Sequence, residues 1–160
     1  PEITGVWPAL WMMPEKSVYG NWPRSGEIDI VETINEKSDE LVTTIHYGHD
    51  YHRQISKTTF LNQLTKLSNP IDHNKISLIW EDKYFEWLLN DQLVFKVNFN
   101  EVENLEPNPF LEEFYLLINV AVGGNWPGTP NSTMYCNSRK SCPDVKKLIV
   151  DYIAYYEKIN

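Results

Sequence analysis

The segment Ser25-Gly-Glu-Ile-Asp-Ile-Val-Glu-Thr33 sets three carboxylates among β-branched apolar residues. The Ile and Val residues favour an extended strand at this point. In a strand, side chains two positions apart share a face, so Glu27 and Asp29 point the same way. Glu32 lies five residues after Glu27 and would point to the opposite face of a regular strand. The segment therefore predicts a strand whose acidic side chains converge only if the strand is locally irregular.

One extra residue in the strand would supply that irregularity. A β-bulge near Ile30 or Val31 would return Glu32 to the face of Glu27 and Asp29, while one apolar side chain still reaches the core. Bulges gather beside active sites, where they re-aim a side chain. The sequence thus predicts three carboxylates on one face of a bulged strand.

Three carboxylates on one face repel one another, and no nearby Lys offsets them. A pair of carboxyl groups is what glycoside hydrolysis needs, one as general acid and the other as base or nucleophile. A third carboxylate between them could spread their pKa values, so that one stays ionised and the other protonated. Two other interpretations stay open on these residues alone: a solvated face of an ordinary strand, and a carboxylate metal site.

Four further motifs flank the acidic segment. They are Gly5-Val6-Trp7-Pro8-Ala9-Leu10-Trp11-Met12-Met13-Pro14, Tyr19-Gly20-Asn21-Trp22-Pro23-Arg24-Ser25-Gly26, Thr44-Ile45-His46-Tyr47-Gly48 and Asn119-Val120-Ala121-Val122-Gly123-Gly124-Asn125-Trp126-Pro127-Gly128. Together they resemble glycoside hydrolase family 16, and within it the laminarinase-type endo-β-1,3-glucanases. The form Glu-Ile-Asp-Ile-Val-Glu is similar to the family's bulged branch, whereas the lichenase and xyloglucan-transglycosylase branch has five residues here. The resemblance runs from about Gly5 to the C-terminus.

The resemblance implies both a fold and a reaction. The fold would be an all-β sandwich of the concanavalin A-like jelly-roll type, with residues 1–160 as one catalytic domain and a concave face as substrate cleft. The reaction would be endo-acting, retaining cleavage of β-1,3-glucan by double displacement, with no cofactor required. Glu27 would be the nucleophile, Glu32 the general acid/base, and Asp29 would tune the pair through hydrogen bonding.

Other residues of the motifs are candidates for binding the sugar chain. His46 would hydrogen-bond in the cleft near Asp29, orienting its neighbours without reacting itself. Trp22 and Trp126 lie in loops and are the leading candidates for stacking on sugar rings. The remaining candidates are Trp7, Trp11, Arg24, Asn119 and Asn125.

Three of these candidates also have a structural interpretation. Trp11 could belong to the core, Arg24 could be merely exposed, and turn chemistry next to a glycine could explain Asn125. Trp80 and Trp87 lie in a predicted meander and are expected in the core.

The composition is that of one globular domain with many aromatic side chains. The 160 residues are 42% hydrophobic and 13% aromatic, and such rings either stack on pyranose faces or fill a sandwich core. The net charge of −8 argues against nucleic acid or an anionic membrane surface as partner and suits a neutral polysaccharide such as β-glucan. No apolar run is long enough to span a bilayer.

The two cysteines and the N-terminal residues give evidence on where in or outside the cell the protein acts. Cys136 and Cys142 close a short loop, which suits a disulfide in a secreted protein, with two free thiols as the alternative. No signal peptide is present and the chain opens at Pro1 without Met, so processing or truncation is expected. We expect a secreted, extracellular monomer.

The rest of the chain reads as strands joined by polar turns. The expected strands are residues 5–13, 41–47, 75–80, 84–89, 93–97, 114–122 and 146–158, with one more between residues 49 and 69 and a turn at residues 35–39. Pro8 points to an edge position or a bulge in its strand. Residues 114–122 are nearly all apolar, which suits burial on both faces. The hairpin ending at 41–47 would set His46 opposite Asp29, within two residues.

One departure from the family concerns the strands that normally precede the Trp-Pro-Ala-x-Trp motif. By resemblance, those strands contribute to the sugar subsites and to a calcium site shared with the Asp of the C-terminal Val-Asp-Tyr motif, here Asp151. A structural calcium ion at Asp151 is therefore an expectation, with the partner ligands absent from this chain. Missing edge strands would expose backbone and apolar surface, which a further N-terminal segment is expected to complete.

Two alternative functions remain open from the sequence. The same sandwich could be a non-catalytic, lectin-like carbohydrate-binding module, although the intact acidic segment argues against pure binding. It could also be a transglycosylase that passes the glycosyl group to another sugar. Agarase-like or carrageenase-like specificity stays open too, although the acidic charge makes a sulfated polymer less attractive.

Overall fold

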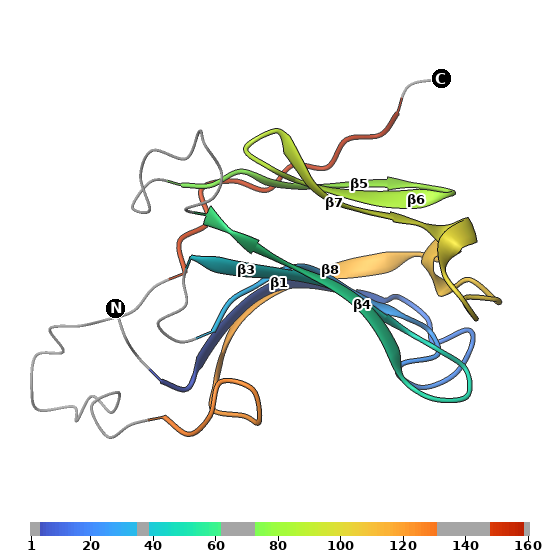
Figure 1. Ribbon diagram of the computed structural model, residues 1–160, viewed down its shortest axis with the longest axis horizontal. Coiled ribbons are helices and arrows are strands. Elements are labelled where there is room, and N and C mark those ends of the chain that lie inside the picture. The colour runs from blue at the N-terminus through green and yellow to red at the C-terminus, as the bar shows by residue number, and fades with distance from the viewer. Residues whose placement is uncertain (1–3, 35–38, 62–72, 131–147, 159–160) are drawn as a thin grey trace, which may run out of the picture.

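The computed structural model describes residues 4–34, 39–61, 73–130 and 148–158, and its strands form two antiparallel sheets (Figure 1). The larger sheet holds β1 (Val6–Pro14), β2 (Glu27–Glu32), β3 (Glu40–Tyr47), β4 (Arg53–Phe60) and β8 (Phe114–Val122), in the order β4-β3-β2-β1-β8. The smaller sheet holds β5 (Ile76–Glu81), β6 (Tyr84–Leu89) and β7 (Gln92–Asn98). Two short 3₁₀ helices, η2 (Phe99–Glu101) and η3 (Pro109–Leu111), lie between β7 and β8. None of the described helices is long and apolar enough to cross a membrane.

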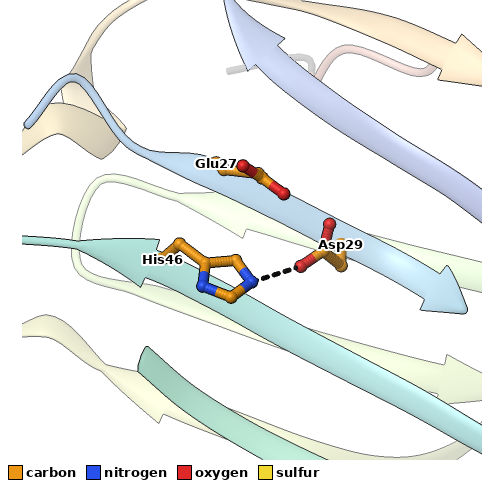
Figure 2. A group of neighbouring side chains, drawn as sticks. All are labelled: Glu27, Asp29 and His46. Carbon is orange, nitrogen blue, oxygen red and sulfur yellow. Dashed lines mark ion pairs between the residues drawn. The ribbon is translucent and has the colours of Figure 1, made fainter. Parts of the chain in front are cut away.

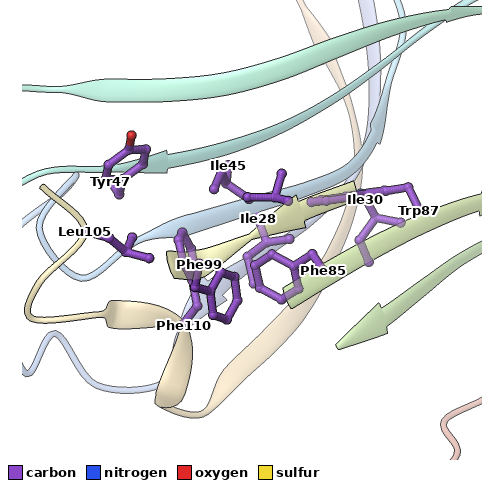
Figure 3. Packing of buried hydrophobic residues seen from close by; sticks show 10 residues of the cluster. Ile28, Ile30, Ile45, Tyr47, Phe85, Trp87, Phe99, Leu105 and Phe110 are labelled. Atoms are coloured by element: carbon purple, nitrogen blue, oxygen red, sulfur yellow. The ribbon is translucent and has the colours of Figure 1, made fainter. Parts of the chain in front are cut away.

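The core lies between the two sheets and is built by strands with one apolar face. Ile28 and Ile30 of β2 point inward, as does Ile45 of β3, and they meet Phe85 and Trp87 of β6 (Figure 3). Large aromatic rings pack edge to face across this layer, which is a favourable arrangement for such pairs. The all-β sandwich predicted from the sequence is thereby confirmed, and the outer face of β2 is left for the carboxylates.

The small sheet is the predicted meander. β6 and β7 are joined through Asn90 and Asp91, both with positive φ, the conformation of a tight two-residue hairpin turn. Trp87 is fully buried, and Trp80 packs partly buried against the core with its indole N–H donating to the carbonyl of Phe110 at 3.0 Å. The core positions expected for both Trp residues are therefore confirmed.

Three expectations for individual strands were wrong in the described residues. β8 was expected to be buried on both faces, but none of its side chains is buried, because it is the end strand of the sheet as described and only part of its inner face meets the core. Of the two positions expected for Pro8, the edge strand is wrong, since β1 pairs with both β2 and β8, and the register shift of the β1–β2 pair falls between Leu10 and Trp11. Residues 148–158 form an exposed segment without strand pairing, although a long strand was expected there.

That C-terminal segment still runs alongside the smaller sheet (Figure 1). Lys158 Nζ lies 3.2 Å from Glu81 Oε1 at the end of β5. The predicted turn at residues 35–39 and the cysteine pair Cys136 and Cys142 fall mostly or wholly outside the described residues.

Candidate active site

A β-bulge in β2 puts the third carboxylate on the outer face of the sheet. Asp29 pairs with Thr44 and Glu32 pairs with Val42, so two residues of β2 oppose the single Thr43 of β3. The pairing of β2 with β1 shifts at the same place. The extra residue restores the alternation for Glu32, and the bulge predicted from the sequence is confirmed.

Gly26 sets the entry of the chain into β2. Its φ is +83°, and a Cβ at this position would lie 3.1 Å from the ring of Phe110 and 3.2 Å from that of Phe114. A side chain would therefore be strained by the backbone and crowded by two core rings. This glycine lets the chain turn directly before Glu27 without moving the core.

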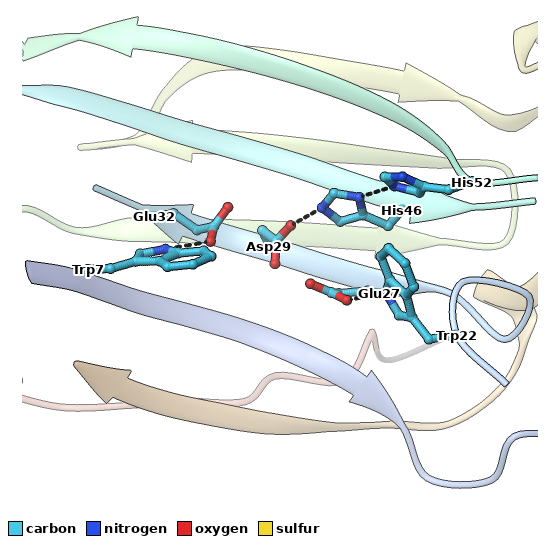
Figure 4. A network of polar contacts seen from close by, with 7 residues as sticks. All are labelled: Trp7, Trp22, Glu27, Asp29, Glu32, His46 and His52. Carbon is cyan, nitrogen blue, oxygen red and sulfur yellow. Dashed lines mark hydrogen bonds and ion pairs between the residues drawn. The ribbon is translucent and has the colours of Figure 1, made fainter. Parts of the chain in front are cut away.

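The three carboxyl groups form a row along β2, with Asp29 between Glu27 and Glu32 (Figure 4). Asp29 is 1% exposed and Glu32 is 8% exposed, while Glu27 is half-buried. Acidic side chains are rarely buried unless they are paired or functional. This burial disagrees with one interpretation that the sequence left open, in which the carboxylates lie on the solvated face of an ordinary strand.

Burial raises the pKa of all three carboxyl groups to about 7, because desolvation disfavours the charged form. The negative charge of Asp29 raises the pKa of Glu27 and of Glu32 further. For Asp29, a hydrogen bond with Glu27 acts in the opposite direction and lowers the pKa. The pKa values of all three carboxyl groups are thus raised together, and a separation between the two glutamates stays a prediction.

His46 faces the central carboxylate from the neighbouring strand (Figure 2). It pairs in register with Glu27, two residues from Asp29, which is within the predicted tolerance. Its Nε2 lies 3.0 Å from Oδ2 of Asp29, an ion-pair distance, although this oxygen has no aligned hydrogen-bond donor among the described residues. Burial lowers the pKa of His46 and favours the neutral ring, while the charges of Glu27 and Glu32 act in the opposite direction.

Two indole N–H groups donate to the outer carboxylates. Trp22 Nε1 lies 2.5 Å from Oε2 of Glu27, and Trp7 Nε1 lies 2.8 Å from Oε1 of Glu32 (Figure 4). Both hydrogen bonds lower the pKa of the carboxyl that accepts them, although burial outweighs them. Each carboxylate at the ends of the row is thus oriented by its own tryptophan.

Of the two other predicted stacking residues, Trp126 lies at the Glu32 end of the row, and Trp11 pairs with Asp29 at its middle. Trp126 packs edge to face on Trp7, with ring centroids 5.1 Å apart. Trp11 donates from Nε1 to Oδ1 of Asn119 at 2.7 Å, across the β1–β8 pair. Trp22 and Trp126 are 49% and 42% exposed. The row of carboxylates therefore has one exposed tryptophan at each end.

Arg24 and Asn125 are less closely tied to the carboxylates. Arg24 donates from Nε to the backbone carbonyl of His49 at 2.9 Å, which joins the loop carrying Trp22 to the β3–β4 connection. Asn125 is exposed in the loop before Trp126. Contact of either residue with sugar stays a prediction.

His52 belongs to this site although no sequence pattern pointed to it. Its Nε2 lies 2.7 Å from Nδ1 of His46, and its ring lies 4.7 Å from that of Trp22, between centroids. The connection from β3 to β4 is tight, with Gly48 at φ +120°, and it folds His52 back beside His46. The glycine after His46 was the one available signal for this return.

The same cluster has the composition of a metal site. Ligand atoms of Glu27, Asp29 and His46 all lie within 4.8 Å of one another, which keeps the metal interpretation open in geometric terms. An ion held there would occupy the carboxylates that glycoside hydrolysis needs. Asp151 is exposed and belongs to no such group among the described residues, so the structural calcium ion stays a prediction that these residues do not support.

Comparison with known proteins gives a consistent family. The model of an XgeA-like, catalytic GH16 domain matches residues 1–78. Glucan endo-1,3-beta-glucosidase A1 of Niallia circulans is 35% identical over 99% of this chain and 23% of its own length. Glucan endo-1,3-beta-glucosidase of Cryptopygus antarcticus is 35% identical over 80% of this chain and 49% of its own length.

A solved structure agrees with these relatives. The laminarinase catalytic domain from Thermotoga maritima superposes with a TM-score of 0.67 at 28% identity, covering 85% of this chain and 55% of that one. The chain therefore spans about half or less of the length of these similar proteins.

Proposed function

We propose that the chain, which is similar to the catalytic domains of glycoside hydrolase family 16, is an endo-acting hydrolase that cleaves β-1,3-glucan with retention of configuration. The observation that carries the proposal is the buried row of Glu27, Asp29 and Glu32 on the outer face of β2. Such a row can flank a scissile glycosidic bond with an acid and a nucleophile, as double displacement requires.

In the first step, Glu27 attacks the anomeric carbon while Glu32 protonates the departing glycosidic oxygen. The products are a covalent glycosyl-Glu27 ester and a shortened glucan. With a pKa raised to about 7, Glu32 keeps its proton below neutral pH, as a general acid must. The Trp22 N–H stabilises the ionised form of Glu27 that attack requires, and the Trp7 N–H does the same for the carboxylate that Glu32 becomes.

In the second step, Glu32 is a carboxylate and accepts a proton from water, which attacks the anomeric carbon and releases Glu27. Asp29 lies between the two groups, so its charge governs how readily each gives up a proton. His46 faces Asp29 and holds it in place. The reaction uses only carboxyl chemistry supplied by this chain.

The substrate class follows from the relatives and from the surface of the site. Exposed Trp22 and Trp126 offer apolar ring faces at the two ends of the carboxylate row, and pyranose rings stack on such faces. The net charge of −8 suits a neutral glucan. Since a polymeric glucan is found outside cells, we also propose that the protein acts as a secreted enzyme.

The decisive experiment is release of reducing ends from a linear β-1,3-glucan. We expect Glu27→Gln to lower turnover by at least about 10³-fold, because the amide cannot form the ester intermediate. Glu32→Gln should accumulate a glycosyl-enzyme adduct, visible by mass spectrometry, from a glycosyl fluoride whose leaving group needs no proton. Glu86→Gln is the matched control, since Glu86 pairs with Lys96 on the outer face of the small sheet and should leave turnover unchanged.

Full turnover by Glu27→Gln would refute the assignment of the nucleophile. Retention itself has a separate test, in which NMR follows the anomeric configuration of the first product. An inverted product would exclude double displacement. Binding of glucan without release of reducing ends by the wild-type chain would favour the lectin-like alternative instead.

A further inference from the structure

His52 contacts two groups that lie against the carboxylates, His46 of β3 and Trp22 of the loop before β2 (Figure 4). Its Nε2 lies 2.7 Å from Nδ1 of His46, which in turn faces Asp29 through Nε2. Its ring packs against Trp22, which donates to Glu27. One side chain therefore supports two separate contacts to the reacting row.

The hydrogen-bond acceptors decide where the protons lie in the series of contacts from His52 through His46 to Asp29. When Asp29 is ionised, its carboxylate can only accept hydrogen bonds, and Nε2 of His46 lies 3.0 Å from its Oδ2. A neutral His46 facing it favourably must carry its proton on Nε2, which leaves a lone pair on Nδ1. The 2.7 Å contact is then satisfied only if Nε2 of His52 carries a proton and donates it.

The ring contacts hold His52 in that orientation. The imidazoles of His46 and His52 stack with centroids 5.0 Å apart and planes 29° apart. His52 lies 4.7 Å from Trp22 on another side. Arg24, two residues after Trp22, donates to the carbonyl of His49, so the two loops that carry Trp22 and His52 are joined directly.

We propose that His52 is a positioning residue of this active site. By donating from Nε2 to His46, it keeps the His46 proton on the nitrogen that faces Asp29, and its ring keeps the Trp22 indole directed at Glu27. The effect on turnover rests on the proposed function. The position of the His46 proton is a property of the substrate-free protein and does not depend on it.

Two substitutions separate the two contacts. In His52→Gln, the side-chain amide can replace the Nε2 donor, but the ring is lost. In His52→Phe, the ring is kept and the donor is lost. His73→Phe is the control, because His73 is exposed and has no part in the site.

The primary measurement is the ¹⁵N chemical shift of the histidine ring nitrogens at one fixed pH near neutrality. The chain has four histidines, so the signals can be assigned by single substitution. We expect wild type, His52→Gln and His73→Phe to show His46 protonated on Nε2 alone. His52→Phe should show a mixture of the two neutral tautomers.

Kinetics on β-1,3-glucan give the second measurement. We expect His52→Phe to lower kcat by roughly fivefold to tenfold with little change in KM, the effect of losing one hydrogen bond that orients the site. His52→Gln should recover most of kcat and instead raise KM, because Trp22 loses its support.

A His46 proton that stays on Nε2 in His52→Phe, with kcat within about twofold of wild type, would overturn the proposal. Equal kcat losses in both His52 variants, with the tautomer unchanged, would also overturn it. If the wild-type chain fails to release reducing ends, the proposed function fails, and the ¹⁵N shifts still decide whether His52 fixes the His46 tautomer.

Discussion

Asp29 is the residue with the widest influence on the chemistry of the site. It is 1% exposed, it lies between the two glutamates, and its charge raises the pKa of both. Like charges held close together in a buried place cannot all ionise at once. Protonation of any one carboxyl is therefore governed by the state of the others, with Asp29 at the centre.

This coupling predicts how the pH dependence of turnover responds to Asp29→Asn. In the wild type, kcat/KM should pass through a maximum near pH 7, falling at lower pH as Glu27 gains a proton and at higher pH as Glu32 loses one. Removing the Asp29 charge lowers the pKa of both glutamates, so both limbs should move to lower pH by roughly one unit. Rates measured from pH 4 to 9 test this, and unmoved limbs would contradict it.

Single residues were predicted from the sequence only where spacing alone decides their place. Alternation along a strand placed Glu27 and Asp29 on one face, and the need for a bulge placed Glu32 there. The raised pKa values were not predictable, because they depend on how deeply the sandwich buries each group. His52 was missed because its contact with His46 depends on the path of the β3–β4 turn.

At the scale of elements, β2 serves the core and the site with opposite faces. Ile28 and Ile30 belong to the buried cluster, while the carboxylates occupy the other side of the same backbone. A strand packed so firmly on one face cannot easily move on the other. The packing under β2 therefore provides the rigidity that a precise carboxylate row requires.

Ile28→Ala tests this dependence. Ile28 is 0% exposed between Glu27 and Asp29 in sequence, and truncation of a buried Ile costs about 2–5 kcal/mol of unfolding free energy. Leu93→Ala on β7, where the side chain is 51% exposed, should cost less than about 1 kcal/mol. Urea denaturation followed by circular dichroism measures both, and losses of similar size would contradict the assignment of Ile28 to the core.

Most elements were predictable because their patterns are local. The meander strands are separated by short polar turns, and β2 and β3 are short runs rich in β-branched residues. The wrong expectations concerned partners distant in sequence. A continuous apolar run such as β8 looks the same whether both faces are covered or one is open, and residues 148–158 carry strand-like residues without pairing.

At the scale of the whole molecule, the two sheets overlap incompletely. The core cluster lies between β2, β3 and the small sheet, whereas alternate residues of β8 (Leu116, Ile118, Val120 and Val122) are exposed. These four pair with Met12, Leu10, Pro8 and Val6 of β1. Leu10 and Met12 face the core, so the exposed row lies on the inner side of the sheet. An apolar row on an end strand favours association.

We therefore expect this chain to bind the dye ANS and to self-associate as its concentration rises. The double substitution Ile118→Lys/Val120→Lys should lower both, because two charges interrupt the apolar row. Tyr115→Lys is the control, since Tyr115 is exposed on the opposite face of β8. Dye fluorescence and sedimentation velocity measure the outcome. An unchanged signal in the double variant would show that this row is not the surface that binds the dye and drives self-association.

The paired tryptophans have an optical consequence. Trp7 and Trp22 each donate an indole N–H to one of the two glutamates, and Trp22 is also open to solvent. Indole emission responds to the ionisation of a bonded carboxyl and to a sugar ring laid over its face. Trp87, sealed in the core, contributes a constant background. The protein thus carries an intrinsic fluorophore at each end of its carboxylate row, and we expect binding of the proposed glucan substrate to change its emission without any label.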